Sequence, residues 1–192
     1  PALIATAVMW NAFFETTYAS FVRMYYQKTF DGMLATPLSL EEIIIAEIVW
    51  SASKATAAAT VMALILGLLG FVAFPSGFWI LPLAFLGGLA FGAIGMWFTG
   101  IIPTIDMFNL PIFLFITPMF LFSSTFFPVS NLPPAAQPAA LLFPLFHLAE
   151  LIRRCSLGIS ESHVLVGLGY LVLFFVVFAY LALNAMKKRL LK

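Results

Sequence analysis

The sequence predicts an all-α integral membrane protein, a polytopic bundle of apolar helices. Of its 192 residues, 63% are hydrophobic and 9% are charged, whereas about 25% of the residues of a soluble domain are charged. The mean hydropathy is +1.09. The apolar runs are long and uninterrupted, as in helical spans, whereas the strands of a membrane barrel alternate in segments of about ten residues. The composition therefore excludes an ordinary soluble domain.

Five apolar stretches are long enough to cross a bilayer. A helix rises about 1.5 Å per residue, so about 20 residues cross the roughly 30 Å of hydrocarbon. We expect spans at about Ala2–Phe21, Ile43–Phe71, Phe78–Ile102, Met107–Phe127 and His163–Met186. The turns between the second, third and fourth spans are short, so residues 1–192 form one transmembrane domain. Because the sequence starts inside an apolar run without Met, we expect an earlier part to precede it.

The distribution of Lys and Arg predicts the orientation, because these residues are enriched in cytoplasmic loops. If five spans alternate, one side carries Arg23, Lys28, Lys187, Lys188, Arg189 and Lys192. The other side carries Arg153 and Arg154, which Glu150 and Glu161 offset. We therefore expect the loop after the first span and the C-terminus to be cytoplasmic, and residues 128–162 to lie outside.

The longest polar segment, Arg23–Ala46, gives the best clue to function. Its first part, Val22–Ala35, has apolar residues at nearly helical spacing. Pro37 then disfavours helix at the residue before it. We expect a short interfacial helix within residues 22–37, followed by a sharp turn. On pattern alone, the alternative is an amphipathic loop that lies on the lipid headgroups.

A capping box predicts where the second span begins. Ser39 fits the N-cap position and Glu42 the third helical position. The carboxylates of Glu41 and Glu42 also suit the positive end of the helix dipole. The loop should therefore join the second span rigidly.

Small residues predict close helix packing. Gly88 and Gly92 form a G-x-x-x-G pattern in the third span. A similar small stripe in the second span consists of Ala52, Ala55, Ala59 and Ala63. Both patterns favour packing rather than chemistry. In the fourth span, Pro111 and Pro118 each remove a backbone hydrogen bond, which suits either a moving kink or a static bend.

The outer segment, residues 128–162, predicts two short helices that Pro144 separates. They cover about Pro133–Phe143 and Leu145–Leu157, too short to cross, so we expect them to re-enter the membrane or lie at its outer edge. In the second helix, Glu150 can pair with Arg153 and Arg154 at i,i+3 and i,i+4 spacing. His147 is predicted to form interfacial hydrogen bonds.

Polar residues inside membrane spans are costly and often functional. The candidates are Asn11, Glu15, Glu47, Lys54, Asp106 and Asn109. Glu47 and Lys54 are seven residues apart, so they lie on one helix face and can share a polar seam. For each candidate, a hydrogen bond between helices is at least as good an explanation as contact with a substrate.

Motifs for enzyme chemistry are absent from the sequence. It contains no phosphate loop, no G-x-S-x-G and no H-E-x-x-H. The lone Cys155 excludes an intramolecular disulfide and a cysteine metal cluster. Ser123, Ser124 and His147 could form an intramembrane protease pair, but they lie in different elements and lack a visible third member. The net charge of +1 gives no indication of a nucleic-acid partner, and we expect none.

Several ordered motifs carry a resemblance to a known family. They are Phe14-Glu15-Thr16-Thr17-Tyr18-Ala19-Ser20-Phe21, Leu34-Ala35-Thr36-Pro37-Leu38-Ser39, Ile116-Thr117-Pro118-Met119-Phe120-Leu121-Phe122-Ser123 and Pro144-Leu145-Phe146-His147. With Phe127-Pro128 and Glu150-Leu151-Ile152-Arg153, they cover nearly the whole chain. The chain resembles ABC type-2 exporter permeases, most closely the nodulation-type lipo-oligosaccharide and daunorubicin-type drug exporters.

The resemblance implies a six-span fold, of which five spans are visible. It also implies that the helix after the first visible span couples to a separate ATPase subunit. The implied coupling residues are Tyr25, Tyr26, Gln27, Lys28, Thr29, Phe30, Asp31, Gly32, Met33 and Pro37. Tyr25, Tyr26, Phe30 and Met33 would be the docking anchors. The implied outer-gate residues are Pro128, Pro133, Pro144, His147, Glu150 and Arg153.

The resemblance further implies a prokaryotic inner-membrane exporter in which two permeases, as a homodimer, join two ATPases. ATP and Mg would then bind the partner subunit, and this chain would carry no cofactor and no catalytic residue. The substrate would be amphipathic or lipid-linked, either an oligosaccharide or glycolipid or a hydrophobic drug. The alternatives are a non-transporting scaffold that anchors a cytoplasmic partner and an intramembrane enzyme.

Overall fold

The computed structural model describes residues 2–73, 76–123, 125, 137–157 and 164–190. Within these ranges the chain is helical and contains no strand. The α-helices are α1 (Ala2–Phe14), α2 (Thr29–Leu34), α3 (Leu40–Leu68), α4 (Ile80–Ile101), α5 (Asn109–Pro111), α6 (Thr117–Phe122), α7 (Gln137–Ala140), α8 (Pro144–Leu157) and α9 (Val164–Leu190). The π-helical turns are η1 (Glu15–Ala19), η2 (Val22–Tyr26) and η5 (Ile112–Ile116), and the 3₁₀ turns are η3 (Ser76–Trp79) and η4 (Ile105–Phe108).

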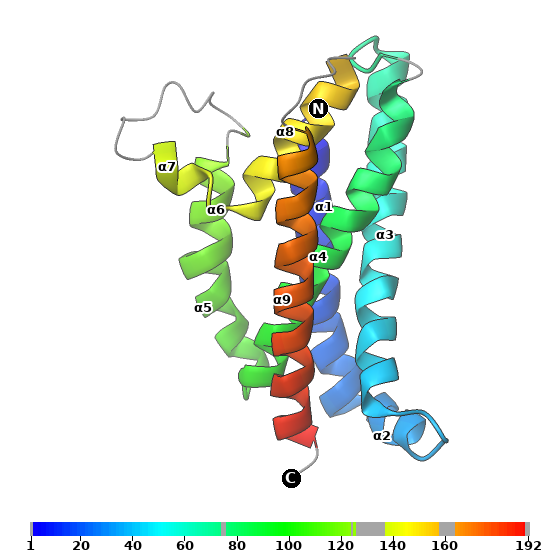
Figure 1. The fold of residues 1–192 in the computed structure, drawn as a ribbon. Helices are drawn as coiled ribbons and strands as arrows, with labels where there is room; N and C mark the ends of the chain where they lie inside the picture. Colours follow the sequence, from blue (N-terminus) through cyan, green and yellow to red (C-terminus); the bar gives the residue numbers. More distant parts are fainter. Residues whose placement is uncertain (1, 74–75, 124, 126–136, 158–163, 191–192) are drawn as a thin grey trace.

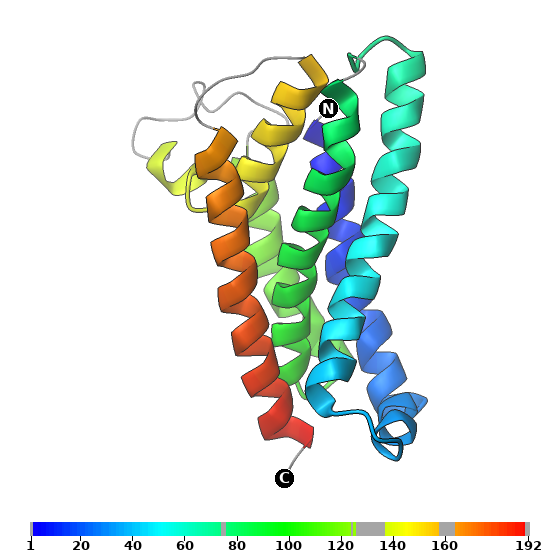
Figure 2. The ribbon, with the colours of Figure 1, turned by 45° about the vertical axis from the view of Figure 1, so that its right-hand side comes forward.

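The long helices run side by side (Figure 1). Helices α1, α3, α4 and α9 form the bundle, and α4 packs against each of the other three. The loop with α2 and the C-terminus lie at one end of the bundle, and α8 and the N-terminus lie at the other (Figures 1 and 2). This agrees with the predicted alternation, which places the α2 loop and the C-terminus on the same side.

Four helical segments in the described ranges are long and apolar enough to cross a membrane. They are Leu40–Leu68, Ser76–Ile101, Ile105–Phe122 and Val164–Leu190, and they correspond to the last four predicted spans. The first predicted span is also helical, from Ala2 to Tyr26, but η1 and η2 divide it into shorter segments. Its α1 portion buries Ile4, Val8 and Phe13 completely, so it is part of the bundle core.

The predicted small residues are confirmed as packing positions. A Cβ atom added at Gly88 would lie 2.7 Å from the Cα of Ala52, and one added at Gly92 would lie 2.4 Å from the hydroxyl of Ser51. The alanine stripe of α3 is buried along its whole length. Helices α3 and α4 therefore touch almost backbone to backbone, an approach that only residues without bulky side chains allow.

The fourth predicted span, η4 to α6, stands at the edge of the bundle (Figure 1). Its helix type changes between Pro111 and Pro118, where η5 forms a π-helical turn. Phe113 and Leu114 are 73% and 83% exposed. This helix therefore presents most of its apolar surface outward.

Candidate functional site

The segment between the first helix and α3 turns back on itself at Lys28. This residue has φ 52° and ψ 29°, the left-handed conformation. It ends the helix that began at Ala2 and starts the six-residue helix α2. The short helix predicted within residues 22–37 is therefore not continuous, because Lys28 divides the segment into η2 and α2. Such a conformation costs a non-glycine residue roughly 1–2 kcal/mol, which the surrounding contacts must offset.

Most of the predicted coupling residues are exposed at this end of the bundle. Tyr25 and Tyr26 are 59% and 64% exposed. The other exposed members are Gln27, Lys28, Thr29, Asp31, Gly32 and Pro37, and Met33 is half-buried. A Cβ atom added at Gly32 would meet no atom within 4 Å. The outer face of α2 is therefore free to receive a partner.

Phe30 differs from the expectation that it is a docking anchor. Its ring is fully buried in a cluster that contains Met24, Leu40 and Ile44. A short helix at the surface packs one of its faces against the protein, and an apolar side chain on that face becomes buried. Phe30 therefore holds α2 against the bundle.

The predicted capping box is confirmed. The Ser39 hydroxyl accepts from the Glu42 amide at 3.3 Å, and the Ser39 amide donates to the Glu42 carboxylate at 2.7 Å. These two bonds satisfy backbone donors that the helix start leaves free. The chain after α2 therefore enters α3 in one fixed direction.

A cluster of charged side chains joins the first helix to α3 just inside this end. Glu15 accepts from Arg23 at 3.0 Å and from Lys54 at 2.6 Å. Arg23 also binds Glu47 in a forked arrangement, Nε to Oε1 at 3.1 Å and Nη2 to Oε2 at 2.5 Å. The Trp50 indole donates to Glu15 at 3.2 Å. Two acids and two bases thus neutralise one another across the helix pair.

Burial makes this cluster structurally important. The side chains of Glu15 and Glu47 are 8% and 11% exposed, and that of Arg23 is 25% exposed. Removing one partner from a buried ion pair leaves an uncompensated charge. Glu47 and Lys54 both face the first helix, as the predicted polar seam requires. They bind different residues of that helix, Glu47 to Arg23 and Lys54 to Glu15.

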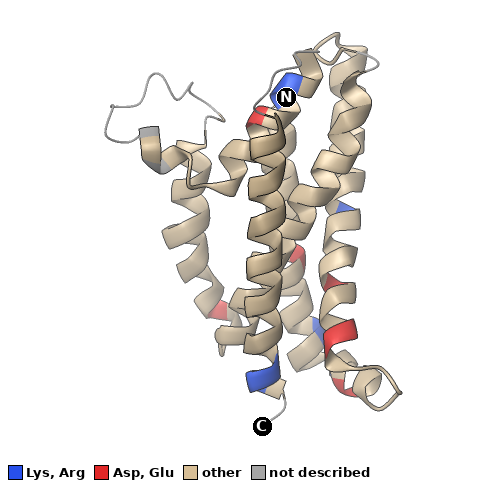
Figure 3. Ribbon diagram, viewed as in Figure 1, with Lys and Arg blue, Asp and Glu red and all other residues tan. Residues whose placement is uncertain are grey.

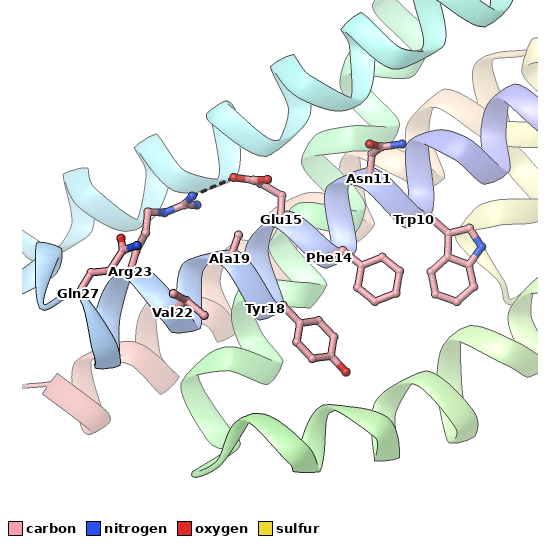
Figure 4. Close-up of a pocket in the computed structure, with 9 residues that line it drawn as sticks. All are labelled: Trp10, Asn11, Phe14, Glu15, Tyr18, Ala19, Val22, Arg23 and Gln27. Carbon is pink, nitrogen blue, oxygen red and sulfur yellow. Dashed lines mark hydrogen bonds and ion pairs between the residues drawn. The ribbon is translucent and has the colours of Figure 1, made fainter.

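A groove of about 650 Å³ runs along the first helix beside the cluster. Its lining residues are Trp10, Asn11, Phe14, Glu15, Tyr18, Ala19, Val22, Arg23 and Gln27. Figure 4 shows the rings of Trp10, Phe14 and Tyr18 on one side of the helix. Glu15 and Arg23 extend to the other side, toward α3 (Figure 4). The groove therefore combines aromatic faces with a charged rim.

The C-terminal end of α9 closes this end of the bundle. Nη1 of Arg189 donates to the carbonyl oxygens of Thr99 and Ile102, the latter at 2.6 Å, where α4 ends. Its guanidinium also lies 5.2 Å from the centre of the Phe21 ring. A cation suits the negative end of a helix dipole. Arg189 thus ties α9 to α4 and to the first helix.

Comparison with known proteins places the chain in a family. The family model described as "ABC-2 type transporter" matches residues 1–157. The chain belongs to the ABC-2 type transporter family. It is 38% identical over 189 residues to Nodulation protein J of Sinorhizobium fredii (strain NBRC 101917 / NGR234). This alignment covers 98% of this chain and 72% of that protein. It is 37% identical over 190 residues to Nodulation protein J of Rhizobium leguminosarum bv. viciae, covering 99% and 73%.

The ABC-2 type transporter family accounts for several features at once. Its members are transmembrane transport subunits that associate with an ABC ATPase subunit, so a multi-pass helical protein without a phosphate loop fits the family. The described residues contain no group of three or more His, Cys, Asp or Glu side chains that could hold a metal ion. The predicted family resemblance is confirmed.

At the opposite end of this ABC-2 type transporter chain, α8 confirms the predicted ion pairs. Glu150 binds Arg153 at 3.0 Å and Arg154 at 3.0 Å. His147 contacts the carbonyl oxygen of Leu141 at 2.9 Å. Pro144 begins α8. Pro128 and Pro133 lie outside the described residues, as does the start of the first predicted half-helix; its described part, residues 137–143, contains α7.

Two of the remaining predicted polar residues, Asn11 and Asn109, bind the main chain. Asn11 donates to the Ala7 carbonyl at 2.9 Å and Asn109 to the Asp106 carbonyl at 3.2 Å. Asp106 itself is exposed in η4, an element that lies toward the α2 end of the bundle (Figure 1). Figure 3 shows that charged residues gather near this end and on α8. Asp106 and Asn109 thus lie near a helix end, whereas Glu15, Glu47 and Lys54 meet between helices.

Two of the candidate residues for an intramembrane protease, Ser123 and His147, also form hydrogen bonds with the main chain. The Ser123 hydroxyl donates to the Met119 carbonyl, and His147 contacts the Leu141 carbonyl. Ser124 lies outside the described residues. The Ser123 bond lies within its own helical segment, whereas the His147 contact joins α8 to the turn that precedes it.

Cys155 on α8 is expected to react slowly with maleimide. Burial raises the pKa of its thiol, and the thiolate is the form that attacks. At neutral pH the thiolate fraction is therefore below that of a free cysteine, and the rate should keep rising at pH values where an ordinary thiol has levelled off. The measurement is the pH profile of the labelling rate. The control is Leu157→Cys in a Cys155→Ser background, because Leu157 is 56% exposed on the same helix. Equal rates at both positions would contradict the prediction.

Proposed function

We propose that this chain is the transmembrane subunit of an ATP-driven exporter and that α2 docks in a separate ABC ATPase. The observation that carries the proposal is the exposed surface of the α2 segment. It projects beyond the bundle (Figure 1), with Tyr25 and Tyr26 exposed and Gly32 open to contact. Exposed aromatic side chains are effective anchors at protein interfaces.

The connection of α2 to α3 suits the transmission of movement. An ATPase can drive transport only through contacts that differ between two states of the permease. Phe30 fixes α2 to the bundle, and the Ser39 cap fixes the entry into α3. A displacement of α2 would therefore move α3 instead of being absorbed by a flexible loop.

We propose an amphipathic or lipid-linked substrate. The groove on the first helix supplies aromatic faces through Trp10, Phe14 and Tyr18 and polar groups through Asn11 and Gln27. Relatives at 37–38% identity carry the name Nodulation protein J, which supports the nodulation-type member of the two resemblances over the drug-exporter type. ATP and Mg would bind the partner, and two permease copies would form the working pair.

The proposed setting is the inner membrane of a bacterium, with the C-terminus and α2 in the cytoplasm. Lys187 and Lys188 lie near the C-terminus, at the same end as α2. This clustering follows the tendency of cytoplasmic loops to carry Lys and Arg. A cytoplasmic α2 is also required for contact with a soluble ATPase.

A bulky side chain on α2 tests the docking role. We expect Gly32→Trp to reduce co-purification of the full-length permease with its ATPase subunit at least tenfold, because the added ring would stand in the interface. The fold should be unchanged, since no atom lies within 4 Å of a Cβ at this position. The matched control is Gly169→Trp, which is also free of neighbours but lies on α9.

Three outcomes separate the hypotheses. Loss of co-purification in Gly32→Trp alone supports docking at α2. Normal assembly of both variants would move the docking site elsewhere. A partner that binds without ATP-dependent transport in liposomes would favour the non-transporting scaffold.

A further inference from the structure

We infer that Arg23 is the positioning residue that joins the first helix to α3 and so sets the location of α2. The inference deepens the proposed function, because it concerns how the docking helix is held. Arg23 lies five residues before the reversal at Lys28. It is therefore the last strong polar contact between the first helix and α3 before the chain turns into α2.

The contacts of Arg23 are directional. Its Nε and Nη2 atoms bind the two oxygens of Glu47, at 3.1 and 2.5 Å, and its Nη1 binds Glu15 at 3.0 Å. A forked pair of this kind fixes orientation as well as distance, and a Lys ammonium cannot reproduce it. Ser20 supports the fork, since its hydroxyl donates to Glu47 at 2.5 Å. The helix end cannot rotate without breaking several of these bonds.

The π-helical turns explain how Glu15 and Arg23 reach the same side. In a regular α-helix each residue turns about 100°, so eight residues would leave their side chains about 80° apart. Hydrogen bonds in η1 and η2 run one residue longer, as from the Ser20 amide to the Glu15 carbonyl and from the Gln27 amide to the Val22 carbonyl. Each π-helical residue turns by less than the roughly 100° of an α-helical residue. The angle between the Glu15 and Arg23 side chains around the helix axis is therefore smaller than about 80°. Such turns are rare and occur frequently at functional sites.

Together these features hold α2 from both directions. On one side, Arg23 fastens the end of the first helix to Glu47 of α3. On the other, the Ser39 cap fixes the start of the same helix α3. Movement of α2 should therefore shift the first helix and α3 as a pair. Without Arg23, α2 could move while the first helix stayed behind.

A spin-label experiment on the full-length permease in nanodiscs tests this inference without the ATPase. Labels are attached at Gly32→Cys on α2 and Ser53→Cys on α3, two exposed positions, in a Cys155→Ala background. We expect a narrow distance distribution in the parent, and a clearly broader one in Arg23→Gln and Glu47→Gln. The double variant should be no broader than the single ones, because both changes break the same contact. Arg153→Gln, which alters an ion pair within α8, should leave the distribution unchanged.

A second measurement separates positioning from stability. In proteoliposomes with the ATPase, transport per ATP hydrolysed should fall about fivefold or more in Arg23→Gln, the range of typical coupling effects, while co-purification persists. A purely structural role would reduce the amount of folded protein and leave this ratio intact. If Arg23→Gln does not fold, Glu47→Gln serves as the test, because it retains the contact between Arg23 and Glu15.

Unchanged distance distributions in folded Arg23→Gln and Glu47→Gln would overturn the inference. Failure of the proposed function gives a different pattern, because the absence of an ATPase partner would leave the spin-label result intact.

Discussion

Gly88→Leu is expected to leave little folded protein. The first side-chain carbon would lie 2.7 Å from the Cα of Ala52 and 3.2 Å from its carbonyl oxygen. Both are backbone atoms, so no rotamer change can relieve the contact and the two helices must separate. Overpacking usually costs about 1–3 kcal/mol, and we expect the upper end or beyond. The measurement is the yield and thermal midpoint of the monodisperse peak in detergent.

Gly169→Leu is the matched control for this change. It makes the same substitution on a long helix, but no atom lies within 4 Å of the added Cβ. Its free energy of unfolding should stay within about 0.5 kcal/mol of the parent apart from the helix-propensity gain of replacing glycine. Comparable yield and midpoint for the two leucine variants would mean that α3 and α4 are not in close contact.

Glu15→Gln is also expected to lower the free energy of unfolding strongly. This carboxylate accepts from Arg23, Lys54 and Trp50 at 3.0, 2.6 and 3.2 Å. The amide keeps the shape but removes the charge, so the cluster changes from neutral to one excess positive charge. Breaking a buried pair typically costs about 3–5 kcal/mol. Because Lys54 is half-exposed and water can solvate it, we expect about 3 kcal/mol, measured as the free energy of unfolding in detergent.

The control for Glu15→Gln is Glu41→Gln. Glu41 pairs with Lys187 where both side chains are close to half-exposed. Exposed pairs contribute about 0–1 kcal/mol, so this variant should unfold almost like the parent. Equal losses in the two variants would show that burial does not set the importance of the Glu15 cluster.

Features governed by neighbouring residues could be predicted from the sequence. The start of α3 is one example, because the Ser39 capping box needs only residues three apart. The Glu150 ion pairs are another, since i,i+3 and i,i+4 spacing places charges together on any helix. The last four predicted spans likewise follow from length and hydropathy alone.

Features governed by helix register could not be predicted in the same way. The apolar spacing across Val22–Ala35 continues through Lys28, and no Gly or Asn there signals a left-handed residue. The pairing of Arg23 with Glu15 depends on π-helical turns, which spacing at 3.6 residues per turn does not reveal. The burial of Phe30, an expected docking anchor, has the same cause, because the break at Lys28 changes which residues face the bundle.

The neutral charge cluster also has a consequence for how the chain enters the membrane. The first helix carries Glu15 and Arg23, and α3 carries Glu47 and Lys54. A charged residue at the centre of a helix opposes insertion by about 2.5–3.5 kcal/mol when it is alone. In the part of the chain that the structure describes, Lys54 pairs with Glu15 of the first helix, and Glu47 pairs with Arg23 there. The two helices should therefore leave the insertion machinery together, as a preassembled hairpin with the α2 loop at its tip.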